Sequence, residues 1–222
     1  MPLKTYEKAT GDAPVAAVIV MHGLGASPND FASFVWDVDL SAVGPVRWVF
    51  PAAPIQPVTI NGGVSMPSWY DILTLDAIAD REHEPSLRAS AALVQEVIDR
   101  EVGRGIPASR IVLGGFSQGC AMALLTGLRA PQRLAGLLGM SGYLPLAAKT
   151  AAERHAANHD VPVFLGHGVY DPVVPFKAAV ASRTELERLG HPVEWHEYPM
   201  QHNVVQEEVE DIAAWLRRVL TA

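Results

Sequence analysis

The sequence contains one cysteine, Cys120, in 222 residues, so it cannot form an internal disulfide. This lack of cysteine pairs suits a reducing compartment. Long apolar runs are also absent. The longest, Val15 to Met21, is far too short to cross a bilayer, and residues 1–10 do not have the apolar stretch of a secretory signal. We therefore expect a cytoplasmic protein with no stable membrane insertion.

Charged residues are few, and basic residues are fewer than acidic ones. There are 24 Asp and Glu against 17 Lys and Arg, which gives a net charge of −7, and no Lys/Arg cluster occurs. A nucleic acid is therefore not expected as a partner. With 49% hydrophobic residues the chain is long enough to bury one substantial core. These values predict a single domain over residues 1–222 and leave open whether it is a monomer or a homodimer.

Motifs for cofactors are lacking as well. Gly23-Leu24-Gly25 follows an apolar run, but Pro28 stands where the third glycine of a dinucleotide fingerprint belongs, and no G-x-x-x-x-G-K-[ST] motif occurs. No cysteine pair or close His/Glu cluster has the spacing of metal ligands. We expect neither a metal site nor a bound cofactor.

What the sequence does contain is an alternation of short apolar runs with helical segments. This alternation is typical of the α/β class, in which a mostly parallel central sheet is flanked by helices on both faces. The predicted strands are Val15–Met21, Val46–Phe50, Arg110–Gly114, Leu134–Met140, Val161–Gly166 and Val193–Tyr198. The predicted helices are Pro28–Leu40, Pro85–Gly103, Ser117–Ala130, Pro175–Leu189 and Val204–Leu220. We expect no large cap domain.

The segment Pro51–Asp71 fits neither pattern. Its prolines and the pair Gly62-Gly63 make it unsuited to a central strand or a helix. Long loops in compact domains are usually lids or binding loops, so we expect a structured loop that forms a substrate wall.

The strongest local signal is Gly115-Phe116-Ser117-Gln118-Gly119, which lies between an apolar strand and an apolar helix. A serine at such a turn is held in a strained conformation with its Oγ exposed, and the glycines avoid collisions of a Cβ with nearby backbone. The pattern predicts that Ser117 is a nucleophile. The alternative is a glycine-rich turn in which Ser117 only caps the next helix.

A nucleophilic serine needs a base and an acid that orients it, and at turns of this kind the acid and then the histidine follow along the chain. Asp171 follows one predicted strand and His202 follows the next, so both should lie at the carboxyl end of the sheet. Asp171 could instead be a turn residue, because Pro172 comes after it. His167 competes as the base, but it precedes Asp171, and we interpret it as a turn-stabilising residue.

Acyl transfer also requires donors for a developing oxyanion. The first would be the backbone N–H of Gln118, at the start of the helix after Ser117. The second would be the N–H of Leu24, in the loop that follows the first apolar strand. We expect His22 to brace this loop rather than to react.

Five stretches carry a resemblance that spans most of the chain. They are His22–Gly25, Phe50–Pro54 with Asn61–Asp71, Gly114–Gly119, His167-Gly168 with Asp171–Pro175, and Met200–Val204. Together they resemble the family of carboxylesterases, lysophospholipases and acyl-protein thioesterases in the α/β-hydrolase superfamily.

The resemblance implies an α/β-hydrolase fold and a triad of Ser117, Asp171 and His202. It also implies an acyl groove, lined by Leu24, Met66, Trp69, Ile72, Leu73, Tyr143 and Val173. One departure is Gln201, where the family usually has glycine, and we expect this side chain to crowd or polarise the groove.

These observations predict a serine carboxylesterase that hydrolyses carboxylic esters or thioesters through an acyl-enzyme on Ser117. An acyl-protein thioesterase or a lysophospholipase with the same mechanism stays open, so the substrate would be a small or lipid-like acyl ester or an acylated protein. A catalytically silent acyl-binding module and, less favoured, a nucleotide-binding protein are the alternatives from other classes. The complete set of nucleophile, base, acid and oxyanion loop favours the enzyme, since binding alone needs no such set.

Overall fold

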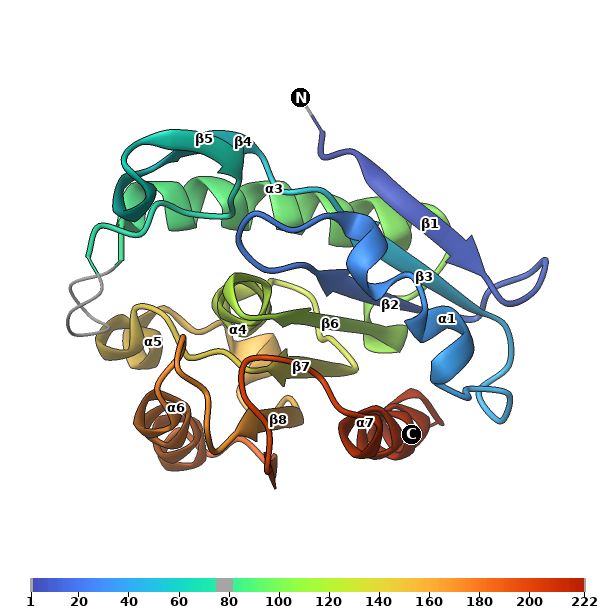
Figure 1. Ribbon diagram of the computed structural model, residues 1–222. Coiled ribbons are helices and arrows are strands. Elements are labelled where there is room, and N and C mark those ends of the chain that lie inside the picture. The colour runs from blue at the N-terminus through green and yellow to red at the C-terminus, as the bar shows by residue number, and fades with distance from the viewer. Residues whose placement is uncertain (1, 75–81, 222) are drawn as a thin grey trace.

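A seven-stranded sheet forms the middle layer of the computed structural model, which describes residues 2–74 and 82–221 (Figure 1). Its strands are β1 (Thr5–Ala9), β2 (Ala16–Met21), β3 (Val46–Pro51), β6 (Ile111–Phe116), β7 (Gly136–Met140), β8 (Val163–Gly168) and β9 (Val193–Tyr198). They lie in the order β1-β3-β2-β6-β7-β8-β9, and only β1 runs antiparallel to its neighbour. The predicted mostly parallel sheet is confirmed.

Helices cover both faces of this sheet (Figure 1). The longer ones are α3 (Glu84–Gly103), α4 (Gln118–Arg129), α6 (Phe176–Arg188) and α7 (Gln206–Thr221). In β2, Ala17 and Ile19 join the apolar cluster that includes residues of α3, α4 and α6, while Val18 and Val20 join the cluster beneath α7. Successive side chains of a central strand point to opposite faces, and helices bury both faces. The sequences of the central strands are therefore continuous apolar runs.

The predicted helix Pro28–Leu40 is wrong as a single element. The segment forms a 3₁₀ turn, η1 (Pro28–Phe31), and one short helix, α1 (Phe34–Asp37), which ends where Val38 becomes extended. Aromatic, β-branched and aspartate residues favour a helix only weakly. Their apolar side chains nevertheless pack inward, so the periodicity reflects burial rather than a continuous helix.

The segment Pro51–Asp71 is a structured connection as expected, but it contains strands that the sequence did not predict. β4 (Ile55–Val58) and β5 (Val64–Pro67) pair antiparallel outside the main sheet, with the 3₁₀ turn η2 (Thr59–Asn61) between them. Gly62 and Gly63 then turn the chain with φ of +67° and +77°. A two-stranded ribbon tolerates proline because each of its strands has an edge that needs no donor.

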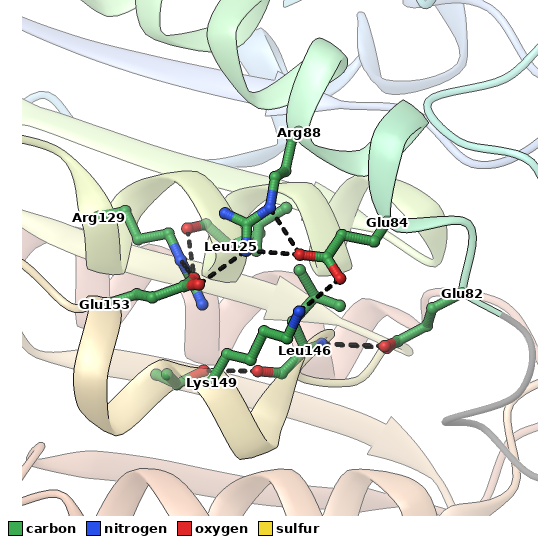
Figure 2. A network of polar contacts seen from close by, with 9 residues as sticks. Glu82, Glu84, Arg88, Leu125, Arg129, Leu146, Lys149 and Glu153 are labelled. Atoms are coloured by element: carbon green, nitrogen blue, oxygen red, sulfur yellow. Dashed lines mark hydrogen bonds and ion pairs between the residues drawn. The ribbon is translucent and has the colours of Figure 1, made fainter.

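Three small elements also escaped the sequence patterns: α5 (Ala147–Glu153), η3 (Ala108–Arg110) and η4 (Ala156–Asn158). Strand β1 escaped them too, because it is a partly exposed edge strand of polar residues. An ion-pair network joins α3 to α5, in which Arg88 contacts Glu84 and Glu153, and Lys149 contacts Glu84 (Figure 2). Exposed pairs each contribute about 0–1 kcal/mol, so the two apolar clusters carry most of the stability.

Helices of the described ranges are all too short or too polar to cross a membrane.

Candidate active site

Ser117 lies at the turn between β6 and α4 with φ of +57° and ψ of −118°. A residue in such a conformation stores about 1–3 kcal/mol of backbone strain. The flanking glycines make the turn possible. A Cβ on Gly119 would lie 2.1 Å from the carbonyl oxygen of Met21, and one on Gly115 would lie 2.3 Å from the carbonyl carbon of Gly119. The backbones therefore approach too closely for any other residue at these two positions.

A chain of hydrogen bonds leads from Ser117 to Asp171. His202 Nε2 lies 2.9 Å from Ser117 Oγ, and His202 Nδ1 lies 2.6 Å from Asp171 Oδ2. The other carboxylate oxygen, Oδ1, accepts the backbone N–H groups of Val173 and Val174 at 2.8 and 2.9 Å. With the proton of the imidazole held on Nδ1 by the carboxylate, Nε2 is left to accept the serine hydroxyl.

The electrostatics of Asp171 favour its ionised form. Burial alone would raise its pKa, but the hydrogen bond from His202 and those from the backbone of Val174 and Val173 outweigh burial and lower it. The carboxylate therefore stays negative near neutral pH and can balance a positive imidazole.

His167 also lies close to the Asp171 carboxylate. Its Nε2 donates to the carbonyl oxygen of Val174 at 2.9 Å and lies 3.5 Å from Asp171 Oδ2. Burial lowers the pKa of His167, which keeps it neutral. This histidine spans the turn after β8, in keeping with the turn-stabilising role expected for it.

The loop after β2 lies directly against Ser117. A Cβ on Gly23 would lie 3.4 Å from Ser117 Cβ. Among the residues that the structure describes, the backbone N–H groups of Leu24 and Gln118 donate to no acceptor. Both donors predicted for an oxyanion are thus available beside Ser117.

His22 braces this loop. Its Nδ1 donates to the carbonyl oxygen of Gly23 at 2.8 Å, while its Nε2 accepts the N–H of Ala53 at 3.1 Å. The two contacts require a neutral ring, and burial lowers the pKa of His22 accordingly.

The side chain of Gln118 ties α4 to the segment before residue 71. Its Oε1 accepts the N–H of Trp69 at 3.0 Å, and its Nε2 donates to the carbonyl oxygen of Tyr70 at 2.8 Å. The indole of Trp69 in turn donates to the carbonyl oxygen of His22 at 2.8 Å. The turn at Ser117 and the loop after β2 are thereby fixed to a common support.

A cavity of about 650 Å³ opens beside Ser117 and His202. Its other lining residues are Gly23, Leu24, Ala26, Asp30, Phe31, Ser33, Phe34, Asp37, Phe116, Val173, Asn203, Val204, Val205, Gln206 and Val209. Of the residues predicted for the acyl groove, Leu24 and Val173 are among them. The other predicted groove residues lie outside this cavity: Met66, Trp69, Ile72, Leu73 and Tyr143.

Two of these residues have roles within the interior. Trp69 is fully buried, and the hydroxyl of the buried Tyr143 lies 2.9 Å from that of Tyr70. Leu73 is exposed, so a contact of this leucine with substrate stays a prediction. Gln201 is also exposed and does not line the cavity, so its predicted effect on the groove likewise stays a prediction.

The sequence patterns missed the wall of the cavity formed by Asp30, Phe31, Phe34 and Asp37. These residues fell within a predicted helix, and no sequence signal indicates which side of Ser117 that segment covers. Within residues 2–74 and 82–221, no group of three or more His, Cys, Asp or Glu residues could hold a metal ion.

The chain is similar in sequence and in structure to known proteins. The family model for phospholipases and carboxylesterases matches residues 8–220. Acyl-protein thioesterase 1 of Mycosarcoma maydis is 40% identical over 96% of this chain and 95% of its own length. SOBER1 of Arabidopsis thaliana has a similar structure, with a TM-score of 0.87 and 28% identity over 92% of this chain and 99% of that one.

Acyl-protein thioesterase 2 of Zea mays is similar in structure too, with a TM-score of 0.84 and 28% identity over 98% of this chain and 99% of that one. The matches cover nearly the whole chain, and the fold expected from the resemblance is confirmed. The chain belongs to the phospholipase/carboxylesterase family of the α/β-hydrolase superfamily and is an ester-bond hydrolase.

Proposed function

We propose that this protein hydrolyses acyl thioesters on proteins, and related carboxylic esters, through an acyl-enzyme on Ser117. The observation that carries the proposal is the hydrogen-bonded series Ser117–His202–Asp171 at the edge of a cavity. The acyl-protein thioesterase named among the relatives, at 40% identity, supports the choice of thioester.

The geometry suits a two-step acyl transfer. Ser117 Oγ attacks the acyl carbonyl carbon while its proton passes to His202 Nε2, and the carbonyl oxygen becomes an oxyanion held by the N–H groups of Leu24 and Gln118. The imidazolium then gives its proton to the departing sulfur or oxygen, which leaves an ester on Ser117. Water, deprotonated by His202, attacks that ester, and the acid and the free serine are released.

Asp171 stays ionised throughout and stabilises the imidazolium at 2.6 Å from Nδ1. The strained turn at Ser117 and the braced loop at Leu24 hold nucleophile and donors in place before substrate arrives. Such preorganisation is the main source of rate in this chemistry, because one lost oxyanion donor costs about 10²–10³-fold.

The test uses a fluorophosphonate probe and an acyl thioester of a cysteine peptide. We expect the probe to label Ser117, and we expect Ser117→Ala to abolish labelling and to lower kcat/KM by about 10⁴–10⁶-fold. Ser65→Ala, at an exposed serine of β5, serves as the matched control and should keep full activity. Turnover that survives Ser117→Ala would contradict the mechanism, and absence of any turnover by the unaltered protein would favour a silent binding module.

A further inference from the structure

The cavity beside Ser117 carries charge of one sign. Asp30 and Asp37 line it, and its described lining includes no lysine or arginine. Both aspartates are exposed at the rim, and the Asp30 carboxylate is oriented by the Ser27 hydroxyl at 2.8 Å. A cation entering the cavity would meet favourable charge, while an anion would be repelled.

Aromatic rings form the wall between these carboxylates and the base. The ring centroids of Phe34 and Phe31 lie 5.1 Å apart at 90°, and those of Phe31 and Phe116 lie 5.8 Å apart. The ring centroid of Phe116 lies 4.7 Å from that of His202. Aromatic faces next to carboxylates are a common way for proteins to hold ammonium and guanidinium groups, because the ring quadrupole attracts cations. Phe34 is buried, whereas Phe31 and Phe116 are partly exposed, so these two rings are the ones that can contact a cation in the cavity.

The position of His202 decides which part of the substrate enters this space. The leaving atom must come within hydrogen-bond reach of His202 Nε2 to receive its proton. The cavity is lined by His202 and by the four residues that follow it, and on the facing side by η1 and α1. The group attached to the leaving atom therefore extends into this cavity.

We propose that this cavity is a leaving-group subsite that selects cysteine thioesters on lysine- or arginine-bearing peptide segments. This inference rests on the proposed function and adds to it the chemistry of the leaving group. A lysophospholipid whose head carries only phosphate is disfavoured, because that anion would enter a cavity that offers two carboxylates and no lysine or arginine.

The experiment compares three peptides that carry the same octanoyl thioester on cysteine and differ only in their flanking residues: two lysines, two serines or two glutamates. One exposed carboxylate–cation pair changes an equilibrium by about 1.5- to 5-fold. With two aspartates at the rim, kcat/KM should favour the lysine peptide over the glutamate peptide by about tenfold at low ionic strength. The preference should shrink in 0.5 M salt, where the Debye length is only a few ångströms.

The double variant Asp30→Asn/Asp37→Asn should bring the lysine-to-glutamate ratio close to one. The substitutions are isosteric, and an amide oxygen at position 30 can still accept from the Ser27 hydroxyl, so the first turn of η1 keeps its cap. Asp37→Asn alone should give an intermediate ratio. Glu96→Gln is the matched control, because Glu96 is exposed on α3, across the sheet from the cavity. That variant should keep the ratio of the unaltered protein.

Three results would overturn the inference while leaving the proposed function intact: equal turnover of all three peptides, a lysine preference that survives in the double variant, or faster hydrolysis of octanoyl lysophosphatidic acid, whose head is purely anionic, than of the lysine peptide. Failure of the unaltered protein to hydrolyse the serine peptide would instead contradict the proposed function. The two failures are therefore distinguishable in one set of assays.

Discussion

The carboxyl group of Glu208 lies in the interior and forms no ion pair with any residue that the structure describes. It belongs to the first turns of α7, six positions after His202, and its side chain is completely inaccessible. Within the described residues neither of its oxygens has a hydrogen-bond partner. It packs against β8, since a Cβ on Gly166 would lie 2.2 Å from Glu208 Oε1. Burial, and to a smaller extent Asp211, raises the pKa of Glu208 to about 8.

The raised pKa makes stability depend on pH. Below about pH 4.5 this group is protonated in both the folded and the unfolded chain, so it does not lower the free energy of unfolding. Between pH 4.5 and about 8 the unfolded chain ionises first, and folding must take up a proton, which costs about 1.4 kcal/mol for each pH unit. The cost is then about 3 kcal/mol at pH 7 and levels off at ~5 kcal/mol above pH 8.

Replacing Glu208 by glutamine removes this titration and keeps the shape of the side chain. The free energy of unfolding of Glu208→Gln, measured with urea, should exceed that of the unaltered protein by about 1 kcal/mol at pH 5 and about 3 kcal/mol at pH 7. The melting temperature at pH 7 should rise by about 10 °C, because a domain of this size gains roughly 2–4 °C per kcal/mol. Glu207→Gln, at the exposed neighbouring position, controls for loss of one negative charge. Parallel pH curves for Glu208→Gln and the unaltered protein would refute the reasoning.

Three further substitutions or treatments test the site. Gly119→Ala should destabilise the protein by at least about 1–3 kcal/mol in a thermal melt, because its Cβ would collide with the backbone of Met21; Gly103→Ala, with open space around it, should not. Asp171→Asn should lower kcat/KM for an aryl ester by about 10³–10⁴-fold, since the imidazole loses its orienting charge; a fall below tenfold would contradict this role. Cys120 should resist iodoacetamide until urea unfolds the protein, because burial raises the pKa of its thiol to about 12; labelling of the folded protein would show that the thiol is accessible.

The order of the central strands and the turn at Ser117 could be predicted from the sequence because their causes are local. The strand β6 needs apolar residues on both faces, and the turn after it needs glycine where backbones touch. Asp171 and His202 could be placed because parallel strands end at the same edge of a sheet. The hydrogen bonds between Ser117, His202 and Asp171 agree with that placement.

The position of the cavity could not be predicted, because it depends on packing between distant segments. Phe31 and Val209 line the same space, yet they are separated by most of the chain. Trp69 is a large aromatic residue of the kind that often lines a groove. Here its indole donates to the carbonyl oxygen of His22, its backbone N–H donates to Gln118, and the side chain is fully buried. A sequence pattern records that a side chain is apolar; it does not record which of several apolar neighbours will cover it.

The two sides of Ser117 therefore differ in how firmly they are held. On one side Gln118, Trp69 and His22 join the turn at Ser117, the segment Pro51–Asp71 and the loop after β2 through buried hydrogen bonds. On the other side the wall consists of short helical turns whose polar residues are exposed. Rigid support suits the groups that must stabilise a transition state, whereas exposed positions can change without disturbing them. Substitutions at Gln118 should consequently lower kcat, and substitutions at Asp37 should change which leaving groups are accepted.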